Sequence, residues 1–566
     1  MSVHNWIWED GANLPPEDSK VTAVHACLTH LGQVLFFHCR SYPFWTRIYD
    51  PNSNTVFADN YVVPKWPVFY EAGESTPAYP IQASKIFCSG HCFLPDGRLL
   101  VAGGELNNPY PDAYEPIAPD RGLRYSFIFD PVPMVVQGPP NPAKDYWKVT
   151  GDPETPFIMK EGRWYPTLTL LNNGTVLCMA GLTDSVVPNP YDPGYYTVLH
   201  NRTPEVYVSF GANQGWFPNN ATDAKLPVDI FYSYPDAYVI PVGDLAGKVF
   251  YASTQLIPDS SEPTGYTYGY SQIFDPFATS APFWEAISNR RTTPSEGSSG
   301  VLLPIRIGSS EKARVIITGG KWENFLDRVD LINLDPQTGS PLWNSNAVTM
   351  GAAKGDHNAV LLPDRTLLII GGVDSAGPVL TSELLDTDTL EWIDPEVHVI
   401  PEMPVPRRYH STAILLPDAR ILLGGGRVEN GGDVENDTER RLSILKPAYL
   451  SDGDQPVITD FPEEITYEES LNITVDGSYA LDSIALMKPG AVTHGSNMDQ
   501  RYVELSFEQV IGPGPETEYN VTAPDNSFIA PPGYYMLFVL KDKSESISGE
   551  SKIPSNAKFI KLNLQP

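Results

Sequence analysis

The sequence has little positive charge and no long apolar run. Its 566 residues include 38 Lys plus Arg against 69 Asp plus Glu, which gives a formal net charge of −31. A chain this acidic lacks the basic surface that binding to a phosphate backbone requires, so we expect no nucleic-acid partner. No window approaches the ~20 consecutive apolar residues of a membrane span, so we also expect no membrane-spanning segment.

The N-terminus lacks the features of a signal peptide. The first ten residues, Met-Ser-Val-His-Asn-Trp-Ile-Trp-Glu-Asp, have neither a basic stretch nor an apolar stretch. We therefore expect a protein that is either cytoplasmic or exported by a non-classical route.

Cysteine is scarce as well. Five cysteines in a chain of this length cannot form a disulfide framework, and the odd number leaves at least one thiol outside any pairing. They are Cys27, Cys39, Cys88, Cys92 and Cys178.

Turn residues are abundant. The 55 Pro and 44 Gly are scattered along the whole chain, which disfavours long helices and indicates an all-β protein. One phrase recurs: an apolar run, a turn of the Pro-Asp-Gly type, a second apolar run and then a Gly pair. Each copy predicts a β-hairpin. The seven copies are Val24–Phe37, Cys92–Gly104, Leu168–Gly181, Ala237–Ala252, Val301–Gly320, Val360–Gly372 and Ile414–Gly425.

The seven copies predict the blades of a β-propeller. In four of them a short strand ending in Asp-Pro follows the hairpin, and four-stranded sheets at this period are typical of propeller blades. Seven blades close a ring without long free edges. We therefore predict an all-β fold with a seven-bladed, kelch-type β-propeller in residues 1–446, its blades starting at about residue 20. The Asp-Pro strands are Ile48–Pro51, Ile128–Pro131, Ile273–Pro276 and Leu334–Pro336.

A different pattern begins after residue 446. Alternating runs without the hairpin phrase follow one another at the spacing of a β-sandwich. We predict a second domain in residues 447–566, an immunoglobulin-like β-sandwich. Two polar segments of the propeller, Leu106–Asp120 and Glu429–Glu439, are expected to be blade loops. The alternating runs are Leu471–Val475, Ile484–Met487 and Tyr534–Leu540.

The repeat register brings reactive side chains together. Seven positions before the turn-opening residue stand Cys88 in the second blade, Tyr165 in the third and His410 in the seventh. Equivalent positions in a propeller are related by rotation about its axis, so we expect these side chains to converge at one face, joined by Tyr409 from the adjoining loop. Taken singly, a Cys or Tyr is usually core and a His is usually a satisfied polar group. Their shared register favours a site.

The donor set points to copper. One His and two Tyr oxygens suit a tetragonal Cu(II) ion better than Zn(II). The C-terminal domain offers a fourth ligand in His494, its only histidine, within a polar loop between apolar strands. A loop that carries His494 up the propeller channel completes a site of Tyr165, Tyr409, His410 and His494.

Other readings of these segments remain open. Cys88–Cys92 also allows a Cys/His metal cluster or a short disulfide loop, although no second Cys pair stands nearby to complete a zinc site. In the sixth blade Asp356 holds the register and His357 stands one place beyond it. We interpret both as structural or as supporting residues.

Five motifs stand in the order and context of a known family. They are Phe87-Cys-Ser-Gly90, Arg163-Trp-Tyr-Pro-Thr167, Arg408-Tyr-His-Ser411, Thr493-His494 through Asn497-Met-Asp-Gln-Arg501, and Pro531-Pro-Gly-Tyr-Tyr535. Through them nearly the whole chain resembles the copper-radical oxidases, the family of galactose oxidase and glyoxal oxidase. The wording Arg-Trp-Tyr-Pro-Thr and Asn-Met-Asp-Gln-Arg is closer to the glyoxal oxidase branch.

The resemblance implies a role for each site residue. Cys88 and Tyr165 would form a thioether cross-link, Tyr165 would carry the radical and bind one copper ion, and Tyr409 would be the axial ligand and base. His410 and His494 would complete the ligand set. The implied reaction is the two-electron oxidation of small aldehydes or primary alcohols, coupled to reduction of O2 to H2O2. It needs no organic cofactor besides the cross-linked pair.

Two points depart from this picture or compete with it. The tryptophan that stacks on the cross-linked tyrosine in the family has no counterpart in Leu182–His200. Candidates to replace it are Tyr191, Tyr195, Tyr196 and His200.

The alternative function is a non-catalytic propeller that binds carbohydrate or protein, with aromatic loop residues such as Tyr110 and Tyr114. The presence of all five site residues favours the enzyme.

Overall fold

The computed structural model describes most of the chain. The described residues are 4–14, 21–38, 45–57, 61–63, 85–106, 121–132, 146–152, 155–188, 196–218, 234–252, 256–258, 266–268, 270–287, 296–306, 309, 313–321, 324–336, 339–428, 438–510, 515–548 and 551–564. Most of the two predicted blade loops, residues 107–120 and 429–437, lies outside these ranges. So do Cys39, Tyr110, Tyr114, Tyr191 and Tyr195.

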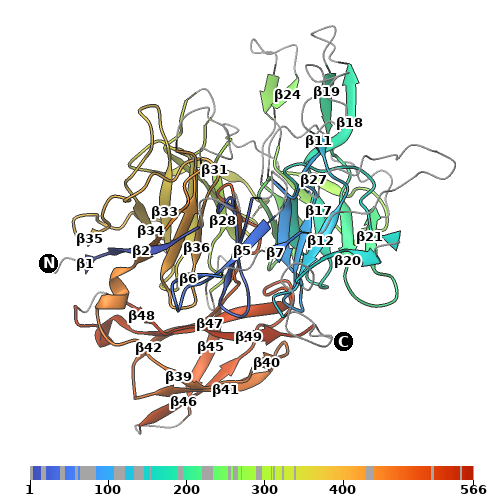
Figure 1. The fold of residues 1–566 in the computed structure, drawn as a ribbon. Coiled ribbons are helices and arrows are strands. Elements are labelled where there is room, and N and C mark those ends of the chain that lie inside the picture. The colour runs from blue at the N-terminus through green and yellow to red at the C-terminus, as the bar shows by residue number, and fades with distance from the viewer. Residues whose placement is uncertain are drawn as a thin grey trace.

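Seven antiparallel sheets surround a common axis, and the C-terminal domain packs against one end of them (Figure 1). The prediction of an all-β, seven-bladed propeller with a C-terminal immunoglobulin-like domain is confirmed. The blades, in order, are β3 (His25–Leu28), β4 (Val34–Phe37), β5 (Trp45–Asp50), β6 (Thr55–Val56) and β7 (Tyr61–Val62); β8 (Gly90–Phe93), β9 (Leu99–Ala102), β12 (Ser126–Phe129) and β13 (Trp147–Val149); β16 (Thr167–Leu170), β17 (Val176–Met179), β20 (Glu205–Val208) and β21 (Gly215–Pro218); β22 (Ala237–Val239), β23 (Val249–Tyr251), β26 (Gln272–Phe274) and β27 (Trp284–Ala286); β28 (Ser299–Leu302), β29 (Arg314–Thr318), β30 (Arg328–Asn333) and β31 (Trp343–Thr349); β32 (Gly355–Leu361), β33 (Thr366–Val373) and β34 (Glu383–Asp386); and β36 (Ser411–Leu415), β37 (Ile421–Gly425), β38 (Arg441–Lys446) and β2 (Ile7–Asn13).

Each predicted hairpin forms the inner two strands of a blade. In the second blade the turn closes when Gly97 N–H donates to the Leu94 carbonyl at 3.0 Å, and Gly97 takes a φ of +86° that a glycine accepts without strain. The strands β8 and β9 on either side are buried throughout, because neighbouring blades cover both of their faces. The sixth blade departs from the prediction of four strands: among the described residues it has three, and an isolated bridge between Leu385 and Trp392 follows them.

The Gly pairs that end the hairpins let adjacent blades approach closely. Gly104 N–H donates to the carbonyl of Arg163 at 2.9 Å, and Gly372 N–H donates to the carbonyl of Arg407 at 2.7 Å. A Cβ atom at Gly103 would collide with the Arg163 carbonyl oxygen. The pair therefore fixes the start of the following blade, where the site residues stand.

The N-terminal strand closes the ring. β2 pairs with β38 in the seventh blade, from Ile7 opposite Lys446 to Asn13 opposite Arg441. The carboxamide of Asn54 in the first blade also holds this strand, since its Oδ1 accepts from Ala12 N–H at 2.8 Å and its Nδ2 donates to the Asp10 carbonyl at 3.1 Å. The first and last blades are thus joined through β2.

The C-terminal domain has two sheet layers joined by β45, which pairs with β46 in one layer and with β42 in the other. Apolar residues between the layers, such as Ile473, Leu486 and Val539, form its core. Its elements are η1 (Ala448–Ser451), β39 (Ile458–Asp460), β40 (Glu464–Ile465), β41 (Ser470–Asp476), β42 (Leu481–Met487), β45 (Tyr502–Gln509), β46 (Glu516–Thr522), β47 (Gly533–Lys541), η2 (Lys543–Glu545), β48 (Ile553–Pro554) and β49 (Lys558–Leu562).

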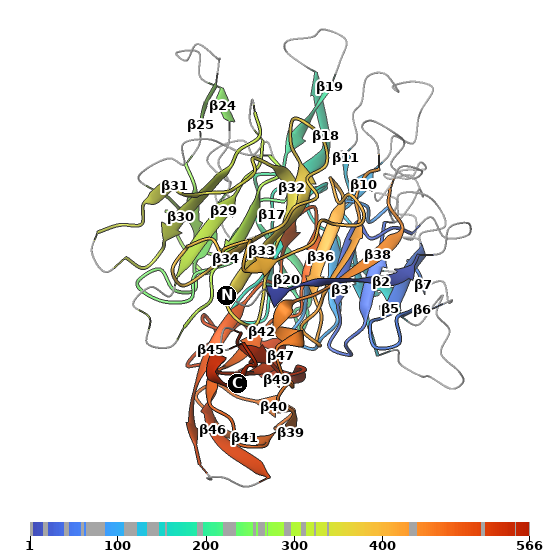
Figure 2. The same ribbon diagram turned by 90° about the vertical axis from the view of Figure 1, so that its left-hand side faces the viewer.

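The hairpin turns of the propeller face this domain. Ala557 N–H donates to the Pro417 carbonyl at 2.7 Å, Tyr502 Oη donates to the Pro363 carbonyl at 3.0 Å, and His30 stacks on Tyr534. The starts of the inner strands therefore lie at the opposite face. Two hairpins, β18 (Leu182–Pro188) with β19 (Tyr196–His200) and β24 (Leu256–Pro258) with β25 (Tyr266–Tyr268), project from that face (Figures 1 and 2).

Short strand pairs complete the described structure. They are β1 (His4–Asn5) with β35 (His398–Val399), β10 (Glu105–Leu106) with β11 (Arg121–Gly122), and β14 (Gly151–Asp152) with β15 (Thr155–Pro156). Within the described ranges we find no helix with the length and apolarity needed to cross a membrane.

Candidate copper site

Main-chain hydrogen bonds near the axis link the register positions of several neighbouring blades. Tyr165 N–H donates to the Cys88 carbonyl at 2.9 Å, and Tyr234 N–H donates to the Tyr165 carbonyl at 3.0 Å. In later blades Asp356 N–H donates to the Gly297 carbonyl at 2.8 Å. These residues share a left-handed backbone, with φ of +55° at Cys88, +65° at Tyr165 and +51° at Tyr234. Such conformations cost a non-glycine residue about 1–2 kcal/mol, so the surrounding bonds must hold them in place.

The seventh blade supplies two of the predicted ligands. Arg163 and Arg407 occupy matching places, because the carbonyl of each accepts from the second glycine of the preceding blade. Tyr165 follows Arg163 by two residues, whereas His410, with a φ of +69°, follows Arg407 by three. The extra residue brings Tyr409 beside His410, with ring centroids 4.0 Å apart.

Both arginines are buried anchors. Arg163 donates to the Ala180 carbonyl at 2.9 Å and forms an ion pair with Glu205 at 2.9 Å. Arg407 donates to the Gly425 carbonyl at 2.8 Å. Each guanidinium therefore ties the segment that carries a tyrosine to the inner strands of its own blade.

His494 reaches the site from the C-terminal domain. Its loop runs through the propeller as β43 (Ala491–Thr493), which pairs with β3 of the first blade, and β44 (Ser496–Asn497), which pairs with β43. The predicted loop in the channel is thus an added inner strand of the first blade.

The motif that follows His494 docks this loop to three other blades. Asp499 Oδ2 accepts from Phe93 N–H at 2.7 Å in the second blade, while Oδ1 pairs with buried Lys488 at 3.0 Å. Gln500 Oε1 accepts from Leu302 N–H at 3.1 Å in the fifth blade. Arg501 Nη2 donates to the Val239 carbonyl at 3.2 Å in the fourth. These bonds explain the Asn-Met-Asp-Gln-Arg motif in structural terms, because they anchor the loop that carries His494 to the propeller.

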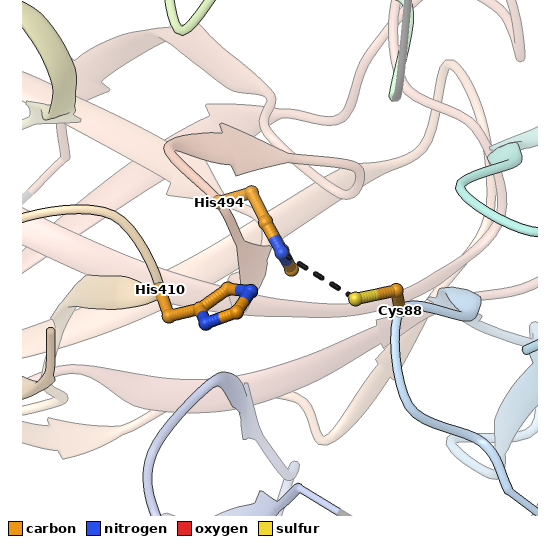
Figure 3. A group of neighbouring side chains, drawn as sticks. All are labelled: Cys88, His410 and His494. Atoms are coloured by element: carbon orange, nitrogen blue, oxygen red, sulfur yellow. Dashed lines mark hydrogen bonds between the residues drawn. The ribbon is translucent and has the colours of Figure 1, made fainter. Parts of the chain in front are cut away.

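The five predicted side chains converge on one spot. Tyr165 Oη and Tyr409 Oη are 3.2 Å apart, and Cys88 Sγ lies 3.6 Å from His494 Nε2. The imidazoles of His410 and His494 meet edge to face, with centroids 4.6 Å apart and planes at 90°, and the donor atoms of Cys88, His410 and His494 all lie within 4.8 Å of one another (Figure 3). Cys88 and His410 are buried, while Tyr165, Tyr409 and His494 are partly exposed.

Thr493 determines which nitrogen of His494 is available to a metal. Thr493 Oγ1 lies 2.9 Å from the Val24 carbonyl, which only accepts, so the hydroxyl proton is donated there. The same oxygen lies 2.6 Å from His494 Nδ1 and must accept from it. His494 therefore carries its proton on Nδ1 and turns an unprotonated Nε2 toward Cys88 and His410.

Burial keeps the metal-free groups neutral. Burial lowers the pKa of His494 to about 3, with further lowering from His91 and Arg427. Burial, followed by Cys88, raises the pKa of Tyr165 well above its ordinary value and also raises that of Tyr409. Neutral imidazoles are the form that binds metals, and a bound divalent cation would reverse the shift of the phenols.

The donor set fits a copper ion. Two imidazole nitrogens and two phenol oxygens gather in a buried place, and the softer thiol lies beside them. Nitrogen and oxygen donors of this kind suit tetragonal Cu(II).

Comparison with known proteins points to oxidases. A family model described as glyoxal oxidase N-terminus matches residues 282–449, and one described as galactose oxidase-like, early set domain matches residues 455–562. Aldehyde oxidase GLOX of Vitis pseudoreticulata is 27% identical over 502 residues, which cover 84% of this chain and 82% of that protein. The chain is thus related in sequence to glyoxal and galactose oxidases.

Two further matches describe the extent of this likeness. A WSC domain-containing protein of Arthroderma benhamiae is 26% identical over 503 residues, or 85% of this chain, but the chain spans only 46% of that protein's length. A fungal alcohol oxidase of the AA5 family, solved in complex with copper, matches with a TM-score of 0.68 and 20% identity over 98% of this chain and 100% of the other. The latter likeness supports the fold.

The structure also bears on the alternatives for Cys88–Cys92. No disulfide joins Cys88 to Cys92 or to the other described cysteines, Cys27 and Cys178. His91 turns away from the candidate copper site: its Nε2 lies 3.0 Å from His25 Nδ1 and its Nδ1 lies 3.6 Å from Cys27 Sγ. Cys92 is part of an apolar core cluster.

Asp356 and His357 take the places that the register predicts. Asp356 has a left-handed φ of +56°, like the other register residues. His357 is fully buried and its Nε2 lies 2.8 Å from Thr318 Oγ1. His357 therefore joins the fifth and sixth blades as a structural residue.

Two aromatic contacts of Tyr165 were missed by sequence reasoning. The indole of Trp164 packs on its ring, with centroids 4.6 Å apart and planes tilted by 35°, whereas the sequence had suggested a covering residue within 182–200. Tyr234 meets the Tyr165 ring edge-on at 5.3 Å, and its hydroxyl donates to the Ser89 carbonyl at 3.0 Å. Counting back seven positions from Pro241 would have found Tyr234.

Proposed function

We propose that this protein is a mononuclear copper-radical oxidase that oxidises small aldehydes or primary alcohols by two electrons and reduces O2 to H2O2. Tyr165, Tyr409, His410 and His494 would bind the copper ion, and Cys88 would be joined to Tyr165 by a thioether bond. For an alcohol the balance is RCH2OH + O2 → RCHO + H2O2, and the hydrate of an aldehyde gives the acid in the same way.

One observation carries this proposal: two phenols, two imidazoles and one thiol from four separate parts of the chain meet in a single, largely buried place. A binding module has no need for that combination. The name of the relative from Vitis pseudoreticulata, an aldehyde oxidase, supports small aldehydes as the first substrates to test.

Each side chain has a distinct task in this proposal. When bound, copper supplies a one-electron redox couple and polarises a substrate hydroxyl. Tyr409 is placed to take the proton of that hydroxyl. A radical on Tyr165, whose Oη lies 3.2 Å from that of Tyr409, would take the hydrogen atom from carbon. His494 is held by Thr493, so its orientation stays fixed during turnover.

The test is the mass of the full chain after aerobic incubation with Cu(II), followed by peptide mapping. We expect a loss of two hydrogens localised to a linked peptide pair that contains Cys88 and Tyr165. A peroxide-coupled assay on aldehydes and primary alcohols should then report activity in the linked protein.

Matched variants separate the site from the core. Cys88→Ala should abolish the cross-link, whereas Cys92→Ala, in the core of the same blade, should retain it. Tyr165→Phe should abolish activity, whereas Tyr207→Phe, a buried tyrosine far out in the third blade, should not. Unlinked peptides from a copper-loaded wild-type chain would refute the oxidase and favour a binding module.

A further inference from the structure

At Cys88 the main-chain link between register residues is replaced by a contact with a side chain. The N–H groups of Tyr165 and Tyr234 each bond the carbonyl of the register residue in the preceding blade. The equivalent residue before Cys88 is Ala23, seven positions ahead of the turn-opening His30. Its carbonyl accepts from Thr412 Oγ1 at 3.0 Å instead.

A side chain replaces the missing carbonyl. Cys88 N–H donates to the imidazole Nε2 of His25 at 3.2 Å. His25 is fully buried and stacks on Phe37, with centroids 4.3 Å apart and planes 6° from parallel. Cys88 is therefore held on both sides, by His25 at its N–H and by Tyr165 at its carbonyl.

The bonds behind His25 fix its tautomer. A main-chain N–H can only donate, so His25 Nε2 is unprotonated and Nδ1 carries the proton. Nδ1 then donates to His91 Nε2 at 3.0 Å, which leaves the proton of His91 on Nδ1, directed at Cys27 Sγ 3.6 Å away. Both ring nitrogens of His91 are used in contacts with His25 and Cys27, so these three residues do not form a metal site. Together they orient the Nε2 acceptor of His25 toward Cys88.

We propose that His25 is a positioning residue for formation of the Cys88–Tyr165 bond. It holds the left-handed backbone of Cys88 so that the thiol faces the Tyr165 ring before any bond exists. This inference rests on the proposed function, which supplies the reaction. In that step an S–C bond forms, the S–H bond and one ring C–H bond break, and O2 takes up the two electrons and two protons as H2O2.

The experiment follows cross-linking in the full chain, expressed without copper and then exposed to Cu(II) and air. His25→Gln keeps an acceptor near the position of Nε2, while His25→Asn keeps a polar group only near Nδ1. His25→Met keeps the packing on Phe37 and offers only a thioether sulfur, a much weaker acceptor than an imidazole nitrogen. His30→Asn, on the same hairpin and stacked on Tyr534, is the matched control.

The readouts are the rate of loss of two hydrogens by intact mass, the copper stoichiometry and the thermal midpoint. Leaving a buried N–H without a strong acceptor should slow cross-linking roughly five- to tenfold or more in His25→Asn and His25→Met. His25→Gln and His30→Asn should cross-link at nearly the wild-type rate, and all four variants should bind one copper ion.

The outcomes separate the two proposals. Wild-type rates in His25→Asn or His25→Met, whichever of the two folds and binds copper, would overturn the role of His25 and leave the oxidase standing. Slow cross-linking in His25→Gln as well as in the other two would also overturn it, because the acceptor would then not be what matters. A wild-type chain that binds copper and never cross-links would overturn both proposals.

Discussion

The hydrogen bond from His494 to Thr493 makes a sharp prediction about copper affinity. Thr493→Val keeps the shape of the side chain but removes the oxygen that accepts from His494 Nδ1. An unsatisfied buried N–H costs about 1–3 kcal/mol, so the proton would be relocated or the ring would turn. Either change takes Nε2 away from the metal. Loss of such a supporting bond typically weakens metal binding by about 10- to 100-fold, and we expect that range here.

Thr412 provides a matched control for this experiment. It is buried like Thr493 and its hydroxyl also donates to a carbonyl of the first blade, that of Ala23. Thr412→Val should therefore lower the thermal midpoint about as much as Thr493→Val does, with no change in copper affinity measured by competition with a chelator. Thr493→Ser should restore the affinity. If Thr493→Val bound copper as tightly as the wild type, the assignment of the His494 tautomer would be wrong.

Three further predictions follow from single contacts. Trp164→Leu should leave the cross-link intact but shorten the lifetime of the Tyr165 radical, measured by its EPR decay in air, because the indole no longer covers the ring; an unchanged lifetime would mean that another residue shields it. Arg163→Met leaves the buried carboxylate of Glu205 without its ion-pair partner and should lower the free energy of unfolding by about 3–5 kcal/mol in denaturant titration. A loss under 1 kcal/mol would contradict the anchoring role. Burial raises the pKa of Asp356 to about 6. Above that pH the ionised carboxylate destabilises the folded, metal-free protein by at most about 3 kcal/mol, whereas below about pH 4 the carboxyl is protonated in the folded and the unfolded protein and has no effect. Asp356→Asn should therefore raise the thermal midpoint at pH 8 but not at pH 4.

The inner hairpins could be predicted because their information is local. In Cys92–Gly104 the turn residues fix the direction of the chain, and the observed β8 and β9 begin and end within two residues of the predicted runs. The repeat register could be predicted for the same reason, since it is counted from the turn within each hairpin. Cys88, Tyr165 and His410 share a left-handed backbone at the place where counting from the turn puts them.

The closure of the ring could not be read from the sequence. β2 pairs with β38 across more than four hundred residues, and its seven residues have no marked alternation of buried and exposed positions. Its place is determined by the free edge of β38, which exists only after the seventh blade has formed. Likewise β43 was expected as a loop because its pairing partner, β3, belongs to the other domain.

The residues that surround the site were missed for different reasons. Tyr234 holds the register, but the turn after it runs from Pro241 to Lys248 with two glycines, so the fourth hairpin lacks the clear phrase. Trp164 stands next to Tyr165, where alternation along the chain predicts a side chain on the opposite face; the left-handed backbone at Tyr165 defeats that rule. His25 lies in the first blade and bonds Cys88 in the second, and no pattern along the chain shows which residues of two neighbouring blades come into contact.

A last prediction concerns the seam between the first and seventh blades. His410 comes from the seventh blade, whereas His494 is carried by β43 on the first, so the candidate copper site bridges the place where the ring closes. β2 holds the same seam through β38 and Asn54. Deleting residues 1–13 should therefore lower the thermal midpoint and also reduce the rise in midpoint that copper produces, because the ligands are no longer held at their spacing before the metal arrives. Asn54→Ala, which removes the side-chain tie between the blades together with the acceptor of the Tyr49 hydroxyl, should give a smaller change in the same direction. A truncated chain that is less stable yet gains the full copper-induced rise would show that β2 stabilises the propeller without organising the site.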